Sequence, residues 1–571
     1  MPRTVRPGVA RGKGAKKTSP LNGRRLLTPV VSCRVLGSVA YCSVTVGNIE
    51  GVTSPCKAHS GDNVSFSSTR RGFLAAALTG AALTLAPVSF AAADTGTSKT
   101  KTITGHLDPG AADFVYLPVE VPAGVNKISV SYTYSKPQVA SGLLGNACDI
   151  GIFDEKGTEL AGKGFRGWSG GFRTEFSISA GETTPGYLPG PIGKGTWNVV
   201  LGPYQVAEQG LDYTVNVTLE YGPDAAPFKP QYPPQQIAGR GAAWYRGDAH
   251  LHTVYSDGKR TPEEVAAGAR AARLDFMIST DHNTPASHGL WGPLAGNDLL
   301  ILTGEEVTTR NGHYLALGLE PGEWIDWRYR ARDKGFEQEA QRIHASGGIV
   351  VPAHPYCPYV ACRWKFGYDD ADAVEVWTGP WTIDDESSVN TWDSMLAHSV
   401  RTGGRWLPAM GNSDAHSVPQ VIGFPHNVVN AAALSRDALL DGIRNGRNWI
   451  AESADVSVDF QVTSGGKSAT VGDRLKVAAD APVTVTAKIA GVPNGVVRFI
   501  TDEGQTQQVT LPASGQGTST WVTTPQLAAY VRVEVRHPKI DGTSGSGTEM
   551  GTVIPLGPMA ALTNPIFLGA S

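Results

Sequence analysis

Alternating apolar and polar residues dominate the segment 94–222. Runs such as 127–132 and 213–217 place every second side chain on one face, and turns rich in Gly and Pro separate them. This period of two predicts an accessory β-sandwich domain. The same alternation returns later, for example at 483–487, and predicts a second small β-domain over 453–571.

The segment 242–452 shows a different pattern, in which strand-like and helix-like stretches alternate. Thr261 followed by Pro262 predicts a helix start, because Thr caps a helix and Pro fits its first turn. We expect strands at 244–250, 276–280, 299–303, 313–317, 349–353, 373–377 and 406–410, and helices at 261–273, 335–345 and 389–402. Repeated strand–helix units predict an α/β fold with a parallel sheet or barrel, and function at the carboxyl ends of the strands. A proline-rich linker, 223–241, is expected to be an extended spacer before this domain.

The first part of the chain, 1–93, is predicted to be a targeting segment. Arg70 and Arg71 precede an uncharged apolar run, 73–90, that ends at three alanines, and this order resembles a twin-arginine export signal. The alternative is a membrane-spanning helix, but Gly, Thr, Ser and Pro dilute the run, so no stable membrane span is expected. The mature protein would then be extracellular, periplasmic or associated with the cell envelope. Because residues 1–63 are basic and lack periodicity, we hypothesise that translation starts downstream of them.

Charge is distributed unevenly along the chain. The formal net charge is −3, but the predicted targeting segment holds 12 of the 49 basic residues and only two acidic ones. The remainder therefore carries 37 basic against 50 acidic residues, a balance of −13. Such a composition argues against nucleic acid as a structural partner, since phosphate contact needs a positive face. It is compatible with binding metal cations.

Three of the six cysteines lie beyond the predicted signal, at Cys148, Cys357 and Cys362. Cys357 and Cys362 could close a small loop by a disulfide in an oxidising compartment, or remain free thiols. Their spacing does not distinguish these alternatives. A structural zinc knuckle is not expected, because the spacing is not Cys-x-x-Cys.

Histidines and carboxylates gather near the ends of the predicted strands. Asp248, His250 and His252 alternate along one strand, so their side chains share a face. Further groups follow along the chain: Asp257, Asp281, His282, Glu305, Glu306, His313, His354, Asp414 and His416. Any one of these histidines is more simply a core or surface residue. So many ionisable groups together would be costly to bury unpaired, and bound Zn, Mn or Fe ions would remove that cost.

The motifs Asp-x-His-x-His, Thr-Asp-His, Ala-His-Pro and Ser-Asp-Ala-His, in this order, resemble the PHP (polymerase and histidinol phosphatase) superfamily. The sequences at 255–258, 304–308 and 375–377 are similar to its CehA/McbA-like branch. The resemblance covers about 244–452, with a short motif at 563–566. It implies a distorted (β/α)7 PHP barrel, here flanked by the two β-domains, that holds two or three divalent metal ions.

The resemblance also implies which residues bind the ions. One ion would bind His250, His252, Glu306 and Asp414; a second would share Glu306 and add His313 and His354; a third would bind Asp257, His282 and His416. Glu306 is preferred to Glu305 because it fits the Gly-x-Glu pattern. Asp257 departs from the family, where a histidine is common, and this puts occupancy of the third site in doubt.

The function implied by the resemblance is hydrolysis by a hydroxide that bridges two metals, with phosphoesters as the leading substrate class and manganese or zinc as typical metals. One alternative is hydrolysis of carboxylic or carbamate esters. The other, of a different class, is a non-catalytic metal-containing protein of the cell envelope or a carbohydrate-binding protein.

Residues around the predicted ligands have expected roles as well. Asp248 and Asp281 are expected to orient the histidines. His288 is a candidate proton donor or substrate contact, and Arg310 a candidate for binding an anionic substrate group; each has the alternative of an ordinary structural role. A cluster of aromatic residues in the first β-domain could contact a glycan or could simply be core: Phe165, Trp168, Phe172 and Tyr187.

Overall fold

The computed structural model describes residues 98–141, 143–359, 361–539 and 556–569, and the backbone of three earlier strands. Those strands form a small antiparallel sheet in a compact unit of their own: β1 (Val30–Leu36), β2 (Val39–Thr45) and β3 (Thr53–Pro55). The predicted export signal, with its apolar run at 73–90, lies outside the described residues. Within the described part of the chain, no helix is long and apolar enough to cross a membrane.

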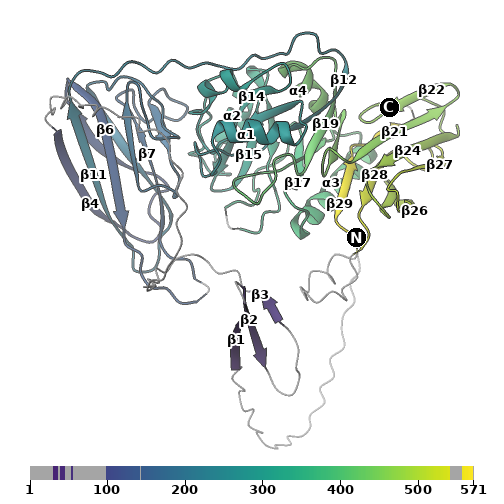
Figure 1. Ribbon diagram of the computed structural model, residues 1–571, viewed down its shortest axis with the longest axis horizontal. Coiled ribbons are helices and arrows are strands. Elements are labelled where there is room, and N and C mark those ends of the chain that lie inside the picture. The colour runs from purple at the N-terminus through teal and green to yellow at the C-terminus, as the bar shows by residue number, and fades with distance from the viewer. Residues whose placement is uncertain are drawn as a thin grey trace, which may run out of the picture. The chain divides into compact units, whose positions relative to one another are not determined.

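Eight strands of the N-terminal domain form two four-stranded antiparallel sheets (Figure 1). The first sheet has the order β5-β10-β7-β8 and the second β4-β11-β6-β9. The strands are β4 (Ser98–Leu107), β5 (Val115–Val121), β6 (Val125–Tyr134), β7 (Ala147–Phe153), β8 (Phe165–Trp168), β9 (Glu175–Ser179), β10 (Gly195–Gln205) and β11 (Leu211–Tyr221). Val130 and Val215 from one sheet pack with Ile150 and Val199 from the other in a single core. Period-two alternation produces this arrangement, because it gives each sheet one apolar face.

The central domain contains nine strands, four α-helices and two short 3-10 turns among its described residues. The strands are β12 (Ala243–Asp248), β13 (Phe276–Ser279), β14 (Leu300–Thr309), β15 (Gly312–Leu317), β16 (Ile349–Pro352), β17 (Val374–Thr378), β18 (Ala409–Asn412), β19 (His426–Ala431) and β20 (Asn448–Ala451). The helices are α1 (Pro262–Ala271), α2 (Gly335–Ala345), α3 (Ile383–Thr402) and α4 (Arg436–Arg444), and the 3-10 turns are η1 (His288–Leu290) and η2 (Gly292–Leu294).

The helix predictions agree with the structure where capping signals or periodicity were clear. Thr261 caps α1: its hydroxyl accepts from the backbone of Glu264, whose carboxylate accepts from the backbone of Thr261. The bounds predicted for α2 are confirmed. Helix α3 begins six residues earlier than predicted, because Thr382 and Asp385 form a capping box there. Helix α4 was not predicted from the sequence.

The sheet of the central domain is mixed rather than parallel throughout. Strands β12, β13 and β14 are parallel, as predicted, but β14 and β15 form an antiparallel hairpin and β15 pairs antiparallel with β16. Only Arg310 and Asn311 link β14 to β15, and two residues allow a hairpin but not a helical crossover. Gly312, with φ of 118°, completes the turn. The fold is therefore mixed α/β and rich in strands, with β17 and β18 paired as a separate parallel sheet.

Some of the C-terminal strands extend the central sheet, whereas four others form a separate antiparallel sheet. The C-terminal strands are β21 (Ser457–Ser464), β22 (Lys467–Thr470), β23 (Arg474–Leu475), β24 (Val483–Ala490), β25 (Val496–Thr501), β26 (Gly504–Thr510), β27 (Gly517–Thr523), β28 (Tyr530–Arg536), β29 (Met559–Thr563) and β30 (Ile566–Leu568). The separate sheet has the order β22-β21-β24-β27. Strand β29 pairs with β20, so β28, β25 and β26 continue the central sheet (Figure 1). The Asn564 side chain supports this junction, because it donates to the carbonyl of Asn448 in β20 and also bonds both the amide and the carbonyl of Ala409 in β18.

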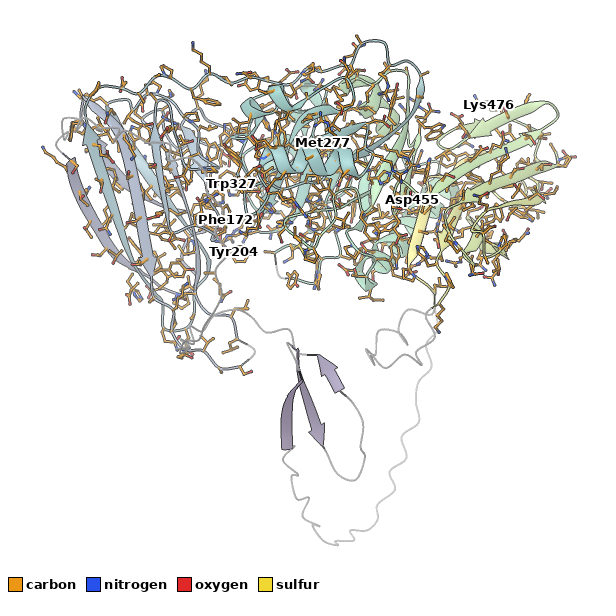
Figure 2. All side chains as sticks on the ribbon, viewed as in Figure 1. Phe172, Tyr204, Met277, Trp327, Asp455 and Lys476 are labelled. Carbon is orange, nitrogen blue, oxygen red and sulfur yellow. A yellow bond between two sulfur atoms is a disulfide. The ribbon has the colours of Figure 1, made fainter. Side chains whose placement is uncertain are left out.

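Aromatic packing joins the N-terminal sandwich to the central domain. Phe165 stacks on Trp324 with ring centroids 4.4 Å apart, and Trp168 lies 4.9 Å from Trp327, which is labelled in Figure 2. Phe165 and Trp168 are buried here, and Tyr187 is buried in the sandwich core, so the core alternative holds for these three residues. Only Phe172 of the predicted glycan-contacting set is exposed, at 38%.

The proline-rich linker, 223–241, lies along the central domain. The backbone amide of Gln231 donates to the carbonyl of Gly289, and its carbonyl accepts from the amide of Gly292. Pro230 also lies close to Gly289, where an added Cβ would be 2.6 Å from the proline Cβ. The linker is therefore held against the domain at this point.

Candidate metal centre

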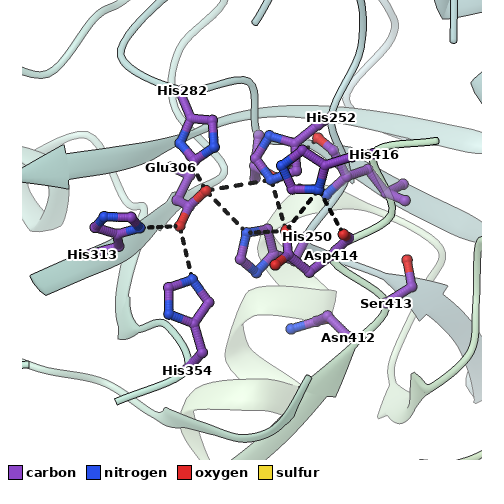
Figure 3. Close-up of polar contacts among 12 residues, drawn as sticks. His250, His252, His282, Glu306, His313, His354, Asn412, Ser413, Asp414 and His416 are labelled. Carbon is purple, nitrogen blue, oxygen red and sulfur yellow. Dashed lines mark hydrogen bonds and ion pairs between the residues drawn. The ribbon is translucent and has the colours of Figure 1, made fainter. Parts of the chain in front are cut away.

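The structure brings all nine predicted metal ligands into one cluster; Figure 3 labels all of them except Asp257. They come from loops after β12, β13, β16 and β18 and from the β14–β15 hairpin: His250, His252, Asp257, His282, Glu306, His313, His354, Asp414 and His416. Parallel strands end at the same edge of a sheet, which is why motifs far apart in the sequence meet here. Isolated bridges from Leu251 to Ala415 and from His282 to Glu306 bind these ends together.

The backbone of two predicted ligands is strained. His354 has φ of 29° and Asp414 has φ of 48°, in the left-handed region that non-glycine residues rarely adopt. Each such residue costs of order 1–3 kcal/mol unless its surroundings hold it in place. The surrounding fold therefore holds these two residues in a strained backbone conformation that directs their side chains into the cluster.

Glu306 stands at the centre of the cluster (Figure 3). One carboxylate oxygen, Oε2, lies 2.9 Å from His282, 3.2 Å from His250 and 3.3 Å from His252. The other, Oε1, lies 2.9 Å from His313 and 3.1 Å from His354. Because its two oxygens face two different groups of histidines, one carboxylate can bridge two ions.

Asp414 closes the first of these groups. Its Oδ1 lies 2.9 Å from Nε2 of His252 and 3.2 Å from Nε2 of His250. With Glu306, these residues offer two imidazole nitrogens and two carboxylate oxygens within 4.8 Å of one another. This is a four-ligand N/O set of the kind that binds Zn²⁺ and related divalent ions.

The facing atoms of this group lack hydrogen-bond partners. Nε2 of His250, Nε2 of His252, Oε2 of Glu306 and Oδ1 of Asp414 are all buried, and none has a hydrogen-bond partner among the described residues. Leaving one buried polar atom unpaired costs about 1–3 kcal/mol, so four converging ones are hard to reconcile with a purely structural role. A divalent cation between them would satisfy all four, and the residues present fit such an ion.

A third group surrounds Asp257. Its Oδ1 lies 3.3 Å from Nε2 of His416 and 3.5 Å from Nε2 of His282, and it also lacks a hydrogen-bond partner in the described part of the chain. His252 belongs to this group as well. Asp257 is thus placed where the sequence predicted a third ligand set, but it is more exposed than Glu306.

The electrostatics of the cluster match its composition. Burial alone would raise the pKa of Glu306, but His282 and His250 outweigh it and hold that pKa well below the usual range. Burial, reinforced by His416 and His282, lowers the pKa of His252 to about 3. The neighbouring carboxylates, by contrast, raise the pKa of His250 well above its usual range and that of His282 to about 9, against the effect of burial. A bound cation would take the place of these protons, because metal binding requires neutral imidazole and ionised carboxylate.

Asp248 and Asp281 act on the backbone and on hydroxyls rather than directly on imidazole rings, which corrects the expected role. Asp248 accepts from the amides of His250, Ser413 and Gly423, and burial raises its pKa to about 6. Asp281 accepts from Ser256, whose hydroxyl lies 3.4 Å from Nδ1 of His252. Asp248 therefore fixes the loops that carry His250 and Asp414, and Asp281 reaches His252 only through Ser256.

Glu375 was missed as a functional residue. It is fully buried, and its Oε1 lies 3.1 Å from Nδ1 of His250. It also accepts from the backbone amide of His354 and from the side chain of Asn412. Two signals in the sequence pointed to it: the motif at 375–377 that contributes to the family resemblance, and a carboxylate within an apolar strand, Val374–Thr378, where an ionisable group needs a partner.

His288 is a structural residue, and the prediction that it donates a proton is wrong. It is 1% exposed, its Nε2 donates to the carbonyl of Gly304, and its Nδ1 accepts from the amide of Gly322. Both ring nitrogens are therefore occupied by backbone. Burial lowers the pKa of His288 to about 4, so the ring stays neutral near pH 7.

Arg310 holds two domains together, and its guanidinium is not free to bind a substrate anion as predicted. It donates to the carbonyls of Pro203, Tyr204 and Asp113 in the N-terminal sandwich. Its guanidinium also lies 3.5 Å from the Asp113 carboxylate, which pairs with Arg330 as well.

Cys357 and Cys362 form a disulfide, which resolves the alternatives left open by the sequence. The bond closes the loop that follows His354, and Sγ of Cys362 lies 3.4 Å from Nδ1 of that histidine. Cys148 is a buried free thiol. The disulfide thus constrains the loop next to a predicted ligand.

Comparison with known proteins gives partial similarities. No family model matches the chain. An uncharacterised protein of Methanocaldococcus jannaschii is 25% identical over 146 residues, which cover 23% of this chain and 80% of that protein.

Solved structures with partial similarity to the chain include two described as phosphoesterases and one described as an amidohydrolase. A two-domain protein of Bacteroides vulgatus, described as containing a predicted PHP-like metal-dependent phosphoesterase, is 15% identical, with a TM-score of 0.30, over 55% of this chain and 95% of that chain. A candidate metal-dependent phosphoesterase of Bifidobacterium adolescentis is 20% identical, with a TM-score of 0.23, over 37% and 96%. An amidohydrolase of Chromobacterium violaceum is 20% identical, with a TM-score of 0.23, over 31% and 89%. The chemistry of the site must therefore be inferred from its own donor atoms.

Proposed function

We propose that this protein is a metal-dependent hydrolase that acts on phosphoesters. The observation that carries the proposal is the set of four buried donor atoms, on His250, His252, Glu306 and Asp414, which converge without hydrogen-bond partners. Imidazole and carboxylate donors of this kind bind Zn, Mn or Fe. The PHP-like family resemblance of the sequence motifs agrees with this chemistry.

The residues of the cluster would hold two ions, with a third at Asp257. His250, His252 and Asp414 would hold one ion and His313 and His354 another, with Glu306 shared between them. Ions bound in such a pair polarise the phosphoryl oxygens and acidify water, so a strong side-chain base is not needed. The protein itself orients the donors: Glu375 fixes His250, and Ser256 supports His252. The pairing through Glu306 favours phosphoesters, because paired ions suit in-line displacement at phosphorus.

Metal content and turnover of the full chain test this function. Elemental mass spectrometry should find two or three Zn, Mn or Fe ions per chain, and the double variant His250→Ala/His252→Ala should lose at least one. The matched control is His398→Ala, on the exposed face of α3, which should keep the wild-type metal content. Bis(p-nitrophenyl) phosphate should be hydrolysed by the wild type and this control, and chelation should abolish turnover.

The same assay separates the alternatives. Hydrolysis of p-nitrophenyl acetate without hydrolysis of the phosphodiester would replace phosphoesters by carboxylic esters. A chain that neither contains nor takes up metal would contradict the proposal and favour a structural or binding role.

We also propose that the protein is exported. The Cys357–Cys362 disulfide supports this, since disulfides persist in oxidising compartments. Cell fractionation should find the wild type outside the cytoplasm, and Arg70→Lys/Arg71→Lys should retain it inside. The upstream pair offers a control, because Arg24→Lys/Arg25→Lys should leave export unchanged. Retention of the wild type in the cytoplasm would refute this part of the proposal.

A further inference from the structure

A pocket of about 270 Å³ connects the metal centre to the N-terminal sandwich. Asp257, His282 and His313 line one side of it. The other side is built by the sheet β5-β10-β7-β8 and the loop after β8. The two domains therefore form the pocket jointly, and a small molecule held in it can touch both the cluster and the sandwich.

Aromatic rings make up much of the wall. Phe172, Tyr204 and Trp327, all labelled in Figure 2, line the pocket together with Phe114 and Trp168. Such rings present negative faces that attract cations. Two of these rings contact cations within the protein. The guanidinium of Arg173 lies 5.3 Å from the centre of the Phe172 ring, and that of Arg310 lies 5.4 Å from the centre of the Tyr204 ring.

One carboxylate in the pocket is unpaired. Asp149, on β7, lies opposite Gly202 of β10 in the sheet register. Among the described residues its side chain has no hydrogen bond or ion pair. Burial raises its pKa to about 7, although the nearby charge of Arg310 opposes that shift. A cationic group that entered the pocket would give this partly buried acid a partner.

Glycines keep this carboxylate open to the pocket. A Cβ on Gly171 would lie 3.2 Å from Oδ1 of Asp149, and a Cβ on Gly202 would lie 2.8 Å from the Trp168 ring. Side chains at these positions would cover the acid or fill the space beside the ring. With glycine at both positions, the acid and the aromatic wall stay accessible to the same ligand.

The positive charges nearby form no ion pair with Asp149 among the described residues. Arg310 lines the same pocket and its charge acts on Asp149, but its guanidinium donates to carbonyls of the sandwich and lies 3.5 Å from Asp113, which also pairs with Arg330. Arg173 donates to the carbonyl of Val254 and does not line the pocket. A cation that entered the pocket could therefore pair with Asp149 directly.

We propose that the substrate carries an alkylammonium group, which this pocket binds with Asp149 as its counter-ion. The inference rests on the proposed function, because the same molecule must present its phosphoester to the metal centre. The aromatic rings stabilise the cation, and Asp149 makes the pocket favour it over a neutral group of the same shape. The N-terminal sandwich is then a specificity-determining part of the active site.

Two substrates that differ in one atom test the proposal. p-Nitrophenyl phosphorylcholine carries a trimethylammonium group, and p-nitrophenyl 3,3-dimethylbutyl phosphate carries its uncharged carbon isostere. The metal-loaded full chain should show a kcat/KM about tenfold higher for the ammonium substrate, which corresponds to one favourable cation contact. Asp149→Asn should raise KM for that substrate by about the same factor and leave the uncharged one unchanged. Asp108→Asn, an exposed acid of the same sandwich, is the control.

A measurement without variants guards against misfolding of Asp149→Asn. Choline should inhibit hydrolysis of the uncharged substrate competitively, and 3,3-dimethylbutanol should inhibit at least tenfold more weakly. Equal kcat/KM for the two substrates, or equal inhibition by the two alcohols, would overturn the inference while the hydrolase stands. Saturable choline binding that is lost in Asp149→Asn, without turnover of any phosphoester, would support the pocket and refute the proposed function.

Discussion

Glu375 and His250 are fully buried partners, with Oε1 of the carboxylate 3.1 Å from Nδ1 of the imidazole. This contact turns Nε2 of His250 toward Glu306 and Asp414, both 3.2 Å away. The same carboxylate accepts from the backbone amide of His354. One side chain on β17 therefore orients two predicted metal ligands from different strands.

Removing the charge of Glu375 should weaken metal binding. Glu375→Gln keeps the shape of the side chain but loses the charged acceptor for His250. Partners of this kind typically contribute about 10–100-fold to metal affinity, so we expect the affinity to fall by about that factor. Competition with a chromogenic chelator measures the affinity. Glu337→Gln, on the exposed face of α2, is the control. An unchanged affinity in Glu375→Gln would show that the contact does not support a ligand.

Glu306 and Asp257 should differ in how much metal they hold. Glu306 faces five histidines, whereas Asp257 faces His282 and His416 at longer distances. Glu306→Gln should therefore remove more ions per chain than Asp257→Asn, which should remove one at most. Elemental analysis after dialysis against equal metal decides between them. A larger loss in Asp257→Asn would contradict the central position of Glu306.

Acid should destabilise the fold through His426. Burial lowers the pKa of His426 to about 4, and its Nε2 lies 2.9 Å from Arg246, so protonation is unfavourable in the folded state. The unfolded chain takes up this proton near pH 6.5. The contribution is therefore complete above pH 6.5 and declines as the pH falls toward 4, by about 2 kcal/mol between pH 7 and pH 5.

Denaturant unfolding at several pH values checks this expectation. The free energy of unfolding of His426→Gln should depend on pH less steeply than that of the wild type between pH 7 and pH 5. His398→Ala, an exposed histidine, should follow the wild type. Parallel pH profiles for His426→Gln and the wild type would rule out His426 as a source of acid sensitivity.

Removing the Glu534 carboxylate should strongly lower the free energy of unfolding. Glu534 is buried among three arginines, at 2.6 Å from Arg498, 2.8 Å from Arg532 and 3.1 Å from Arg536, which together hold its pKa at about 2 against the effect of burial. Glu534→Ala leaves these charges without their shared partner, and breaking a buried ion pair costs about 3–5 kcal/mol.

An exposed ion pair in the same domain provides the comparison for Glu534. Asp459 pairs with Lys488 at 3.0 Å, but both side chains are more than half exposed. Asp459→Ala should cost about 1 kcal/mol or less, because solvent screens the pair. Thermal or denaturant unfolding of the two variants should differ clearly, and equal losses would mean that the Glu534 network is not a main support of the C-terminal strands.

Short-range patterns in the sequence determined many of the secondary-structure elements of this protein. Period-two alternation predicted the strands of the sandwich, and Thr261 with Pro262 predicted the start of α1. The spacing of His250 and His252 predicted that their rings share a site, and they do, although both lie in the loop after β12 rather than in the strand. These features depend on neighbours within a few residues, so a pattern reveals them.

Only the tertiary structure decided which buried groups meet. Glu375 is 125 residues away from His250 in sequence, and no local pattern links them. His288 and Arg310 were candidate functional residues in the sequence. In the fold, His288 donates to a backbone carbonyl and Arg310 donates to the N-terminal sandwich. The same is true of Asp149, whose place beside the metal centre depends on how two domains pack. A polar side chain acquires its role from the partners that burial leaves it, and those partners come from distant parts of the chain.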